Sequence, residues 1–259
     1  MREIMYDHSS LLIVGLLFLG LLVAIELGFR LGDRIAESAS DSARAQVNTI
    51  QASLLGVLAL LLGFTFSLAL QRYDARSAAV VTESNAIGTA ILRADLLPEP
   101  YRDQARDALS SYLDLRIQAA SISLDRVDER DEILDRTAAL QNRLWQIGSN
   151  ASLEYPNPVQ TGLFVQALND LIDTYGSRNA ALDRHVPEIV LFLLFGTFAL
   201  TACLVGFSSG ISGNRASFPT YILVVLITFL VFIIIDLDRP RRGLIEVSQK
   251  SLIELRTEP

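Results

Sequence analysis

Four long apolar runs constrain this chain more than any other feature, because each is long enough to cross a membrane. They cover roughly Ser10–Phe29, Ala52–Leu70, Glu188–Phe207 and Phe218–Ile235. A helix of about 20 apolar residues crosses the ~30 Å hydrocarbon layer of a bilayer. The runs form two close pairs, and a long, mostly polar segment separates the pairs. The sequence therefore predicts an all-α membrane protein with four transmembrane helices.

The long polar segment between the two pairs is also predicted to be helical. Its apolar residues recur at intervals of three and four, a pattern that indicates amphipathic helices. One such series is Leu109, Tyr112, Leu113, Arg116 and Ile117. Breaks between helices are expected at Pro98 with Pro100, near Asp125–Asp131 and in Gly148–Pro158. We therefore expect a helical domain inserted between the second and third spans.

These patterns divide the chain into four expected parts. They are transmembrane helices 1 and 2 in residues 1–70, a helical cytoplasmic domain in residues 71–187, transmembrane helices 3 and 4 in residues 188–238, and a cytoplasmic C-terminal segment in residues 239–259. With four spans, both termini and the inserted domain lie on one side. Near the span ends that side carries eight arginines against four on the other. Because basic residues concentrate in cytoplasmic loops, that side is predicted to be the cytoplasm.

Charge and composition argue against several classes of protein. The net charge is −7 and the pI is about 4.9, and no basic patch with interleaved aromatic residues is present, so no nucleic-acid partner is expected. Cys203 is the single cysteine, and the two histidines, His8 and His185, are far apart in sequence. The sequence contains no phosphate-binding loop, nucleophile elbow or HExxH motif. We therefore expect no enzyme, no catalytic residue, no cofactor and no metal site.

The second apolar run is predicted to continue beyond the membrane as one helix. No proline or helix-stopping glycine lies between Ala52 and Leu97. About 45 residues at 1.5 Å each make a helix of roughly 70 Å. Ten residues, most of them small or polar, share one arc of about 80° on this helix. They are Ser53, Gly56, Leu60, Gly63, Ser67, Gln71, Asp74, Ala78, Val81 and Asn85.

We call this arc the stripe. Two interpretations of the stripe remain open. Small residues let helices approach closely in lipid, so the stripe is compatible with helix packing. In a ring of identical subunits, the same stripe would line a water-filled pore with polar side chains and an apolar constriction. The constriction would lie at Leu60, Gly63 or Phe64. Asp74 favours cations, whereas its neighbours Arg72 and Arg76 favour anions, and the sequence does not rank them.

A charged cluster follows the fourth apolar run directly. Its members are Asp236, Asp238, Arg239, Arg241 and Arg242. Charges at the end of a span mark the membrane interface, and arginines there can contact anionic headgroups. We therefore expect this cluster to lie at the membrane surface.

Two segments resemble the bacterial bestrophin-like membrane proteins, long described as a domain of unknown function. The first is Leu61–Pro98, LLGFTFSLALQRYDARSAAVVTESNAIGTAILRADLLP, and the second is Asp236–Gln249, DLDRPRRGLIEVSQ. The resemblance implies a four-span subunit of a pentameric anion channel in the bacterial inner membrane, with cytoplasmic termini and a pore lined by the second span. The chain departs from bestrophins in lacking their cluster of pore phenylalanines and isoleucines, since only Phe64 and Phe66 lie near.

The sequence thus predicts an oligomeric bestrophin-like ion channel whose partners are membrane lipids, inorganic ions and further copies of itself. The pore-lining candidates run from Ser53 to Asp74 with Phe64 included, and the stripe extends into the cytoplasm through Ala78, Val81 and Asn85. The alternative is a non-conducting membrane scaffold or signalling subunit whose cytoplasmic helices bind a partner. A secondary transporter ranks third, because inverted repeats and broken helices are not visible.

Overall fold

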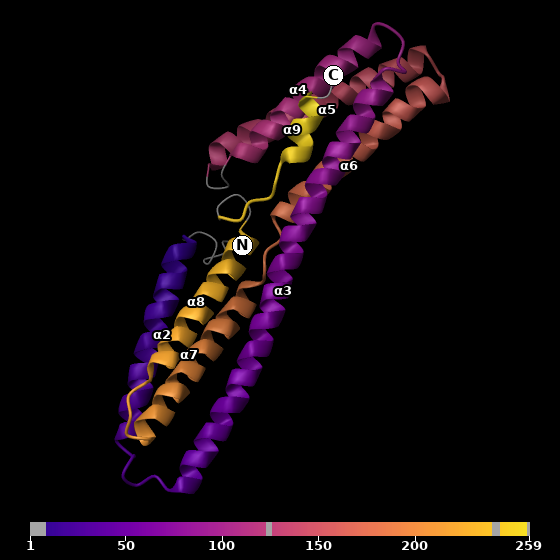
Figure 1. The fold of residues 1–259 in the computed structure, drawn as a ribbon. Coiled ribbons are helices and arrows are strands. Elements are labelled where there is room, and N and C mark those ends of the chain that lie inside the picture. Colours follow the sequence, from indigo (N-terminus) through magenta and orange to yellow (C-terminus); the bar gives the residue numbers. More distant parts are fainter. Residues whose placement is uncertain (1–8, 123–125, 240–243, 258–259) are drawn as a thin grey trace. The chain divides into compact units, whose positions relative to one another are not determined.

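The computed structural model describes residues 9–122, 126–239 and 244–257, and every regular element in these ranges is helical (Figure 1). Within the described residues, four helices are long and apolar enough to cross a membrane. They are α2 (Ser10–Asp33), α3 (Asp41–Ala94), α7 (Glu188–Ile211) and α8 (Phe218–Asp238). The all-helical class and the four apolar candidate spans are therefore confirmed.

Helix α3 is longer than the sequence indicated, because it begins at Asp41 and not at Ala52. Ser40 explains the earlier start, since its Oγ accepts a hydrogen bond from the backbone N–H of Ala43 at 3.3 Å. A serine in this position caps a helix, and the carboxylate of Asp41 in the first turn favours the positive end of the helix dipole.

The chain divides into two compact units. Residues 1–71 and 185–239 form the first, which we call the span unit, and residues 72–184 and 240–259 form the second, which we call the polar unit. Helix α3 contributes its first part to the span unit and its last part to the polar unit.

Paired glycines bring two helices of the span unit close together. Helix α2 presents Gly28 and Gly32, and α7 presents Gly206 and Gly210, so each helix carries glycines four residues apart. A Cβ atom added at any of the four would collide with the backbone of the facing helix. Such spaced glycines permit close van der Waals contact between helices in lipid. The sequence analysis did not identify this α2–α7 pair.

An apolar core completes the span unit. It combines Leu21 and Ile25 of α2, Leu58 of α3, Phe198 of α7 and Val231 of α8. All five side chains are buried. The contribution of α3 to this core comes from its aliphatic side, which leaves its other side outside the core.

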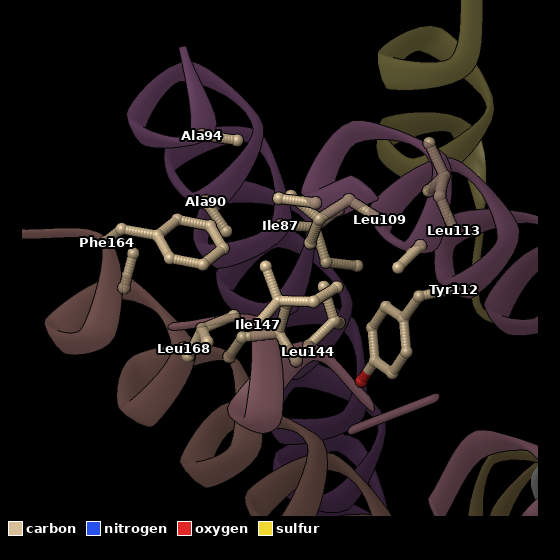
Figure 2. Packing of buried hydrophobic residues seen from close by; sticks show 14 of the residues in the cluster. Ile87, Ala90, Ala94, Leu109, Tyr112, Leu113, Leu144, Ile147, Phe164 and Leu168 are labelled. Atoms are coloured by element: carbon tan, nitrogen blue, oxygen red, sulfur yellow. The ribbon is translucent and has the colours of Figure 1, made fainter. Parts of the chain in front are cut away.

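The polar unit consists of amphipathic helices around a second core. Its elements after α3 are α4 (Tyr101–Ser121), α5 (Val127–Glu154), the π-helical turn η1 (Pro158–Gly162), α6 (Leu163–Leu182) and α9 (Lys250–Thr257). Figure 2 shows Ile87 of α3 packed with side chains of α4, α5 and α6, among them Leu109, Tyr112, Leu144 and Phe164.

The expected helix breaks are partly right. Helix α3 ends at Ala94 and α4 begins at Tyr101, so Pro98 and Pro100 do separate two helices. The break expected in Gly148–Pro158 is confirmed in its second half, because α5 ends at Glu154 and η1 begins at Pro158, but Gly148 itself lies inside α5. A Cβ at Gly148 would lie 3.2 Å from Leu168 Cδ1 of α6, so this glycine serves close packing between helices. The break expected in the acidic patch is also placed too late, since α5 begins at Val127 and includes most of it.

Candidate functional site

Helix α3 has one buried side and one exposed side in the span unit. Leu58, Thr65 and Ala69 lie on the buried side. Thr65 satisfies its hydroxyl within the helix, where Oγ1 donates to the carbonyl of Leu61 at 2.8 Å. This side lies about 180° around the helix from the stripe of small and polar residues.

All candidate pore residues of the span unit are exposed in the single chain. They are Ser53, Gly56, Leu60, Gly63, Phe64, Ser67 and Gln71. Among the described residues, no atom lies within 4 Å of a Cβ built at Gly56 or Gly63, apart from their own helix backbone and chain neighbours. These two glycines therefore do not pack against other spans of the same chain. Leu60 and Phe64 are 58% and 61% exposed.

Two polar residues of the stripe bond to each other along the helix. Gln71 Nε2 donates to Ser67 Oγ at 3.3 Å. Nearer the start of the same helix, Ser53 Oγ donates to the carbonyl of Thr49 at 3.0 Å. Intrahelical bonds of this kind keep polar groups satisfied at membrane depth.

The stripe continues in the polar unit with the same division of sides. Asp74, Ala78, Val81 and Asn85 are exposed, whereas Arg76, Val80, Glu83 and Ile87 are buried. Arg76 turns into its own unit, where Nη2 donates to the carbonyl of Arg184 at 2.7 Å and Nε donates to the carbonyl of Ala181 at 3.2 Å. Arg76 is therefore absent from the exposed side, and Asp74 is present on it.

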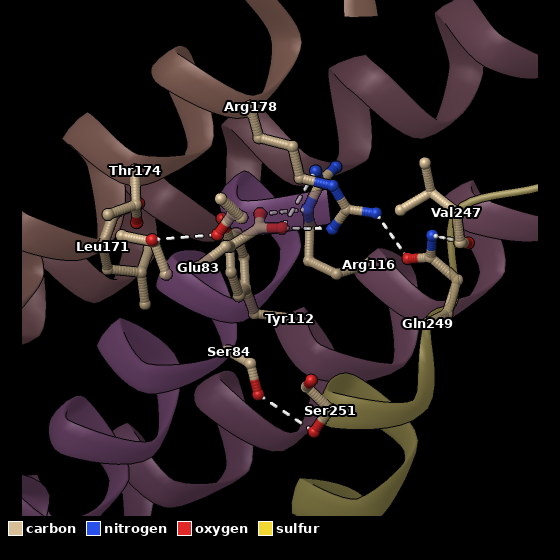
Figure 3. A network of polar contacts seen from close by, with 12 residues as sticks. Glu83, Ser84, Tyr112, Arg116, Leu171, Thr174, Arg178, Val247, Gln249 and Ser251 are labelled. Carbon is tan, nitrogen blue, oxygen red and sulfur yellow. Dashed lines mark hydrogen bonds and ion pairs between the residues drawn. The ribbon is translucent and has the colours of Figure 1, made fainter. Parts of the chain in front are cut away.

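A buried charge network lies on the inner side of α3 in the polar unit (Figure 3). Glu83 of α3 accepts from Arg116 Nε of α4 at 2.6 Å and also from Arg178 of α6. The side chain of Glu83 is 0% exposed and those of the two arginines are each 2% exposed. Arg116 also stacks over the ring of Tyr175, with Cζ 4.7 Å from the ring centre.

The same network holds the segment that precedes α9. Arg178 Nη2 donates to Gln249 Oε1 at 2.7 Å, and Gln249 Nε2 donates to the carbonyl of Val247 at 2.9 Å. Ser84 of α3 adds a bond from its Oγ to the carbonyl of Ser251 at 2.9 Å. Residues far apart in sequence are thus fixed around one carboxylate (Figure 3).

Burial changes the pKa of one arginine in this network. Desolvation lowers the pKa of the Arg178 guanidinium, the Arg116 charge acts in the same direction, and Glu83 opposes both. The sequence analysis missed the network, although one signal was present. Arg116 occupies a position in the apolar series of α4, where a charged residue is expected to be buried with a partner.

The charged cluster after the fourth span lies at the end of α8. Asp236, Asp238 and Arg239 are buried. Asp238 Oδ2 accepts from the backbone N–H of Val186 at 2.8 Å, and Arg239 Nη1 donates to Ser10 Oγ at 3.2 Å. The other two members, Arg241 and Arg242, lie outside the described residues. A role of this cluster at the membrane surface stays a prediction.

Metal binding has no obvious place in the described residues. Within residues 9–122, 126–239 and 244–257, no three His, Cys, Asp or Glu side chains gather in a group that could hold a metal ion. The arrangement therefore offers two features to explain, the exposed side of α3 and the buried network around Glu83.

The sequence model of the bestrophin-like domain matches residues 19–252 of the chain. This match includes all four candidate spans, wholly or in large part, and nearly all of the polar unit. The chain belongs to the bestrophin-like family. The family resemblance inferred from residues 61–98 and 236–249 is thereby confirmed.

Solved structures with the same fold support this assignment. A crystal structure of a bacterial bestrophin homologue from Klebsiella pneumoniae, a variant with one tryptophan-to-alanine mutation, matches with a TM-score of 0.61 and 18% identity over 97% of this chain and 100% of that one. A second crystal structure, of a membrane protein with a proline-to-alanine mutation, matches with a TM-score of 0.58 and 17% identity over 93% and 99% of the two chains. No curated protein matches this bestrophin-like chain.

Proposed function

We propose that this chain is a subunit of a homo-oligomeric ion channel whose pore is lined by the exposed side of α3. The observation that carries the proposal is the division of α3 into two sides. Every candidate residue from Ser53 to Asn85 is exposed in the single chain, while the opposite side is buried. At Gly56 and Gly63 this exposed edge meets no other described span of its own chain, so it is available to a water-filled conduit or to another subunit.

The polar residues of the pore would lie at Ser67, Gln71 and Asp74, and the narrow zone at Leu60, Gly63 and Phe64. In a channel, a constriction of apolar side chains gates the pore by excluding water, and rings of polar side chains select ions. Family membership supports the same function, since the similar Klebsiella pneumoniae structure is of a bestrophin homologue.

Cation preference follows from which charges reach the exposed side. Asp74 is exposed, whereas Arg76 is buried and bonds to carbonyls of its own unit. Each copy of the chain in a ring would contribute one Asp74 carboxylate to the conduit. A ring of carboxylates attracts cations and repels anions.

The proposal includes the position of the subunit in the membrane. The excess of arginines on one side supports cytoplasmic termini and a cytoplasmic polar unit, inserted between the second and third spans. The bestrophin-like family supports a bacterial inner membrane location. A pentameric ring is the expected assembly.

The second candidate function is a non-conducting scaffold. Large apolar side chains exposed on the polar unit favour it, among them Leu92 at 72%, Leu153 at 80% and Val159 at 64%. A partner protein that covers these side chains would explain them without a pore. Conductance separates the two functions.

Planar bilayer recordings with the purified full-length protein test the proposal. Ion currents are expected, with potassium preferred over chloride in a salt gradient. Asp74→Asn removes the carboxylate from the conduit and is expected to move the reversal potential towards that of chloride. Glu132→Gln is the matched control, because Glu132 is an exposed carboxylate on α5 away from α3. Absence of current at any voltage, with the protein shown to be folded and oligomeric, contradicts the channel and favours the scaffold.

A further inference from the structure

A cavity of about 170 Å³ lies in the polar unit, between the end of α4, the start of α5 and the end of α6. Its polar lining comes from Arg116, Arg130, Asn179 and Asp183, of which Asp183 is exposed. Much of the remaining wall is aliphatic and comes from Ile133, Leu134 and Leu182. The cavity therefore combines a cationic end with an apolar wall.

At the cationic end, one donor group of the Arg116 guanidinium is not used by the described part of the protein. Arg116 uses Nε and Nη2 for Glu83. Among the described residues, its Nη1 group has no hydrogen-bond partner. Glu83 also holds Arg178, so two guanidinium groups share one carboxylate and the buried trio carries one excess positive charge. An unbalanced buried charge is unfavourable, and an anion beside Arg116 offsets it.

Asn179 adds a second donor to the same cavity. Its backbone carbonyl accepts from Asp183 N–H at 3.2 Å. Its side-chain amide has no hydrogen-bond partner in the part of the chain that the structure describes. A carboxylate has two oxygens, so it can accept from Arg116 and from Asn179 at once.

We propose that this cavity binds a small organic monocarboxylate. Its carboxylate accepts from Arg116 and Asn179, and its aliphatic part packs against Ile133, Leu134 and Leu182. An inorganic anion would satisfy Arg116 but would leave the aliphatic wall uncovered. Since Arg116 also holds Glu83, an occupied cavity steadies α3 through that ion pair.

Thermal melting and calorimetric titration of the purified full-length protein test this site. Isovalerate is the probe, and isovaleramide is its uncharged counterpart of nearly equal shape. Isovalerate is expected to raise the melting temperature as its concentration rises, because it binds the folded state alone. The amide is expected to bind at least about 10-fold more weakly, since charge-assisted hydrogen bonds are lost.

Two variants locate the site on the molecule. Asn179→Leu is expected to weaken isovalerate binding about 10-fold, and Ala119→Phe is expected to abolish it by filling the cavity, which Ala119 lines. Ala180→Leu is the matched control on the exposed side of α6 and should bind as the parent does.

Four results overturn the proposal. They are no binding of isovalerate to the unmodified protein, equal binding of acid and amide, equal stabilisation by chloride at the same ionic strength, and unchanged affinity in a folded Asn179→Leu protein. The binding measurements need no current, so this site and the proposed channel can fail independently.

Discussion

Glu83 and Arg116 form an ion pair inside the polar unit, with Oε1 of Glu83 2.6 Å from Nε of Arg116 and neither side chain more than 2% exposed. Glu83 also belongs to α3, on the side opposite the stripe. Ion pairs therefore fix the side of α3 that carries Glu83, and the side that carries the stripe is exposed. Arg178 and Gln249 extend this attachment to the segment before α9.

Replacing the buried carboxylate is expected to destabilise the protein strongly. Glu83→Gln leaves two guanidinium groups without a counter-charge, which costs about 3–5 kcal/mol. Thermal or chemical unfolding of the full-length protein measures this loss. Asp95→Asn is the matched control, because Asp95 pairs with Arg106 at 3.2 Å in an exposed pair worth only about 0–1 kcal/mol. Equal losses in the two variants would show that the Glu83 network does not hold α3.

Because α2 and α7 are in close contact, a glycine substitution at this contact is expected to destabilise the protein. Gly28→Ala places a methyl group against the carbonyl of Cys203, so the helices must separate. Overpacking of this kind costs about 1–3 kcal/mol. Gly15→Ala is the control on the same helix, because nothing described lies within 4 Å of its added Cβ. Melting temperatures in detergent should fall for the first variant and stay near the parent value for the second. A similar fall in both would contradict the close contact.

Alkaline stability should depend on Tyr112. Burial raises the pKa of its phenol above the ordinary value of 10.0. Above about pH 10 the unfolded chain releases this proton while the folded chain keeps it, so stability falls as pH rises, by up to about 1.4 kcal/mol per pH unit. Tyr112→Phe removes this dependence. Between pH 8 and 11 the melting temperature of the parent should fall more steeply than that of Tyr112→Phe, and parallel curves would contradict the assignment.

Much of the span architecture could be predicted from the sequence, because hydropathy is a local property. Runs of about 20 apolar residues identified all four candidate spans. The continuity of α3 could be predicted because no proline interrupts it. The glycine pairs of α2 and α7 were missed, since their role depends on which two helices face each other. Gly148 was misread for the same reason, because its partner Leu168 lies on another helix.

The stripe was visible as a periodicity of α3, but its exposure was not. Only the structure distinguishes Asp74, which is exposed, from Arg76, which is buried. The Glu83 network joins residues from α3, α4, α6 and the segment before α9, so no local pattern contains it. Arg116 in an apolar series was the one sign that a charge would need a buried partner.

Cysteine accessibility in a conducting protein tests the central claim most directly. Cys203 is the single cysteine, so Cys203→Ala gives a background free of thiols. Ser67→Cys then places one thiol on the stripe, and Phe66→Cys places one about 100° away at nearly the same depth. If the exposed side of α3 lines the pore, a charged, water-soluble thiol reagent will block the current of the Ser67→Cys protein and spare that of Phe66→Cys. Block of Phe66→Cys alone, or of neither protein while current persists, would contradict a pore at this side of α3.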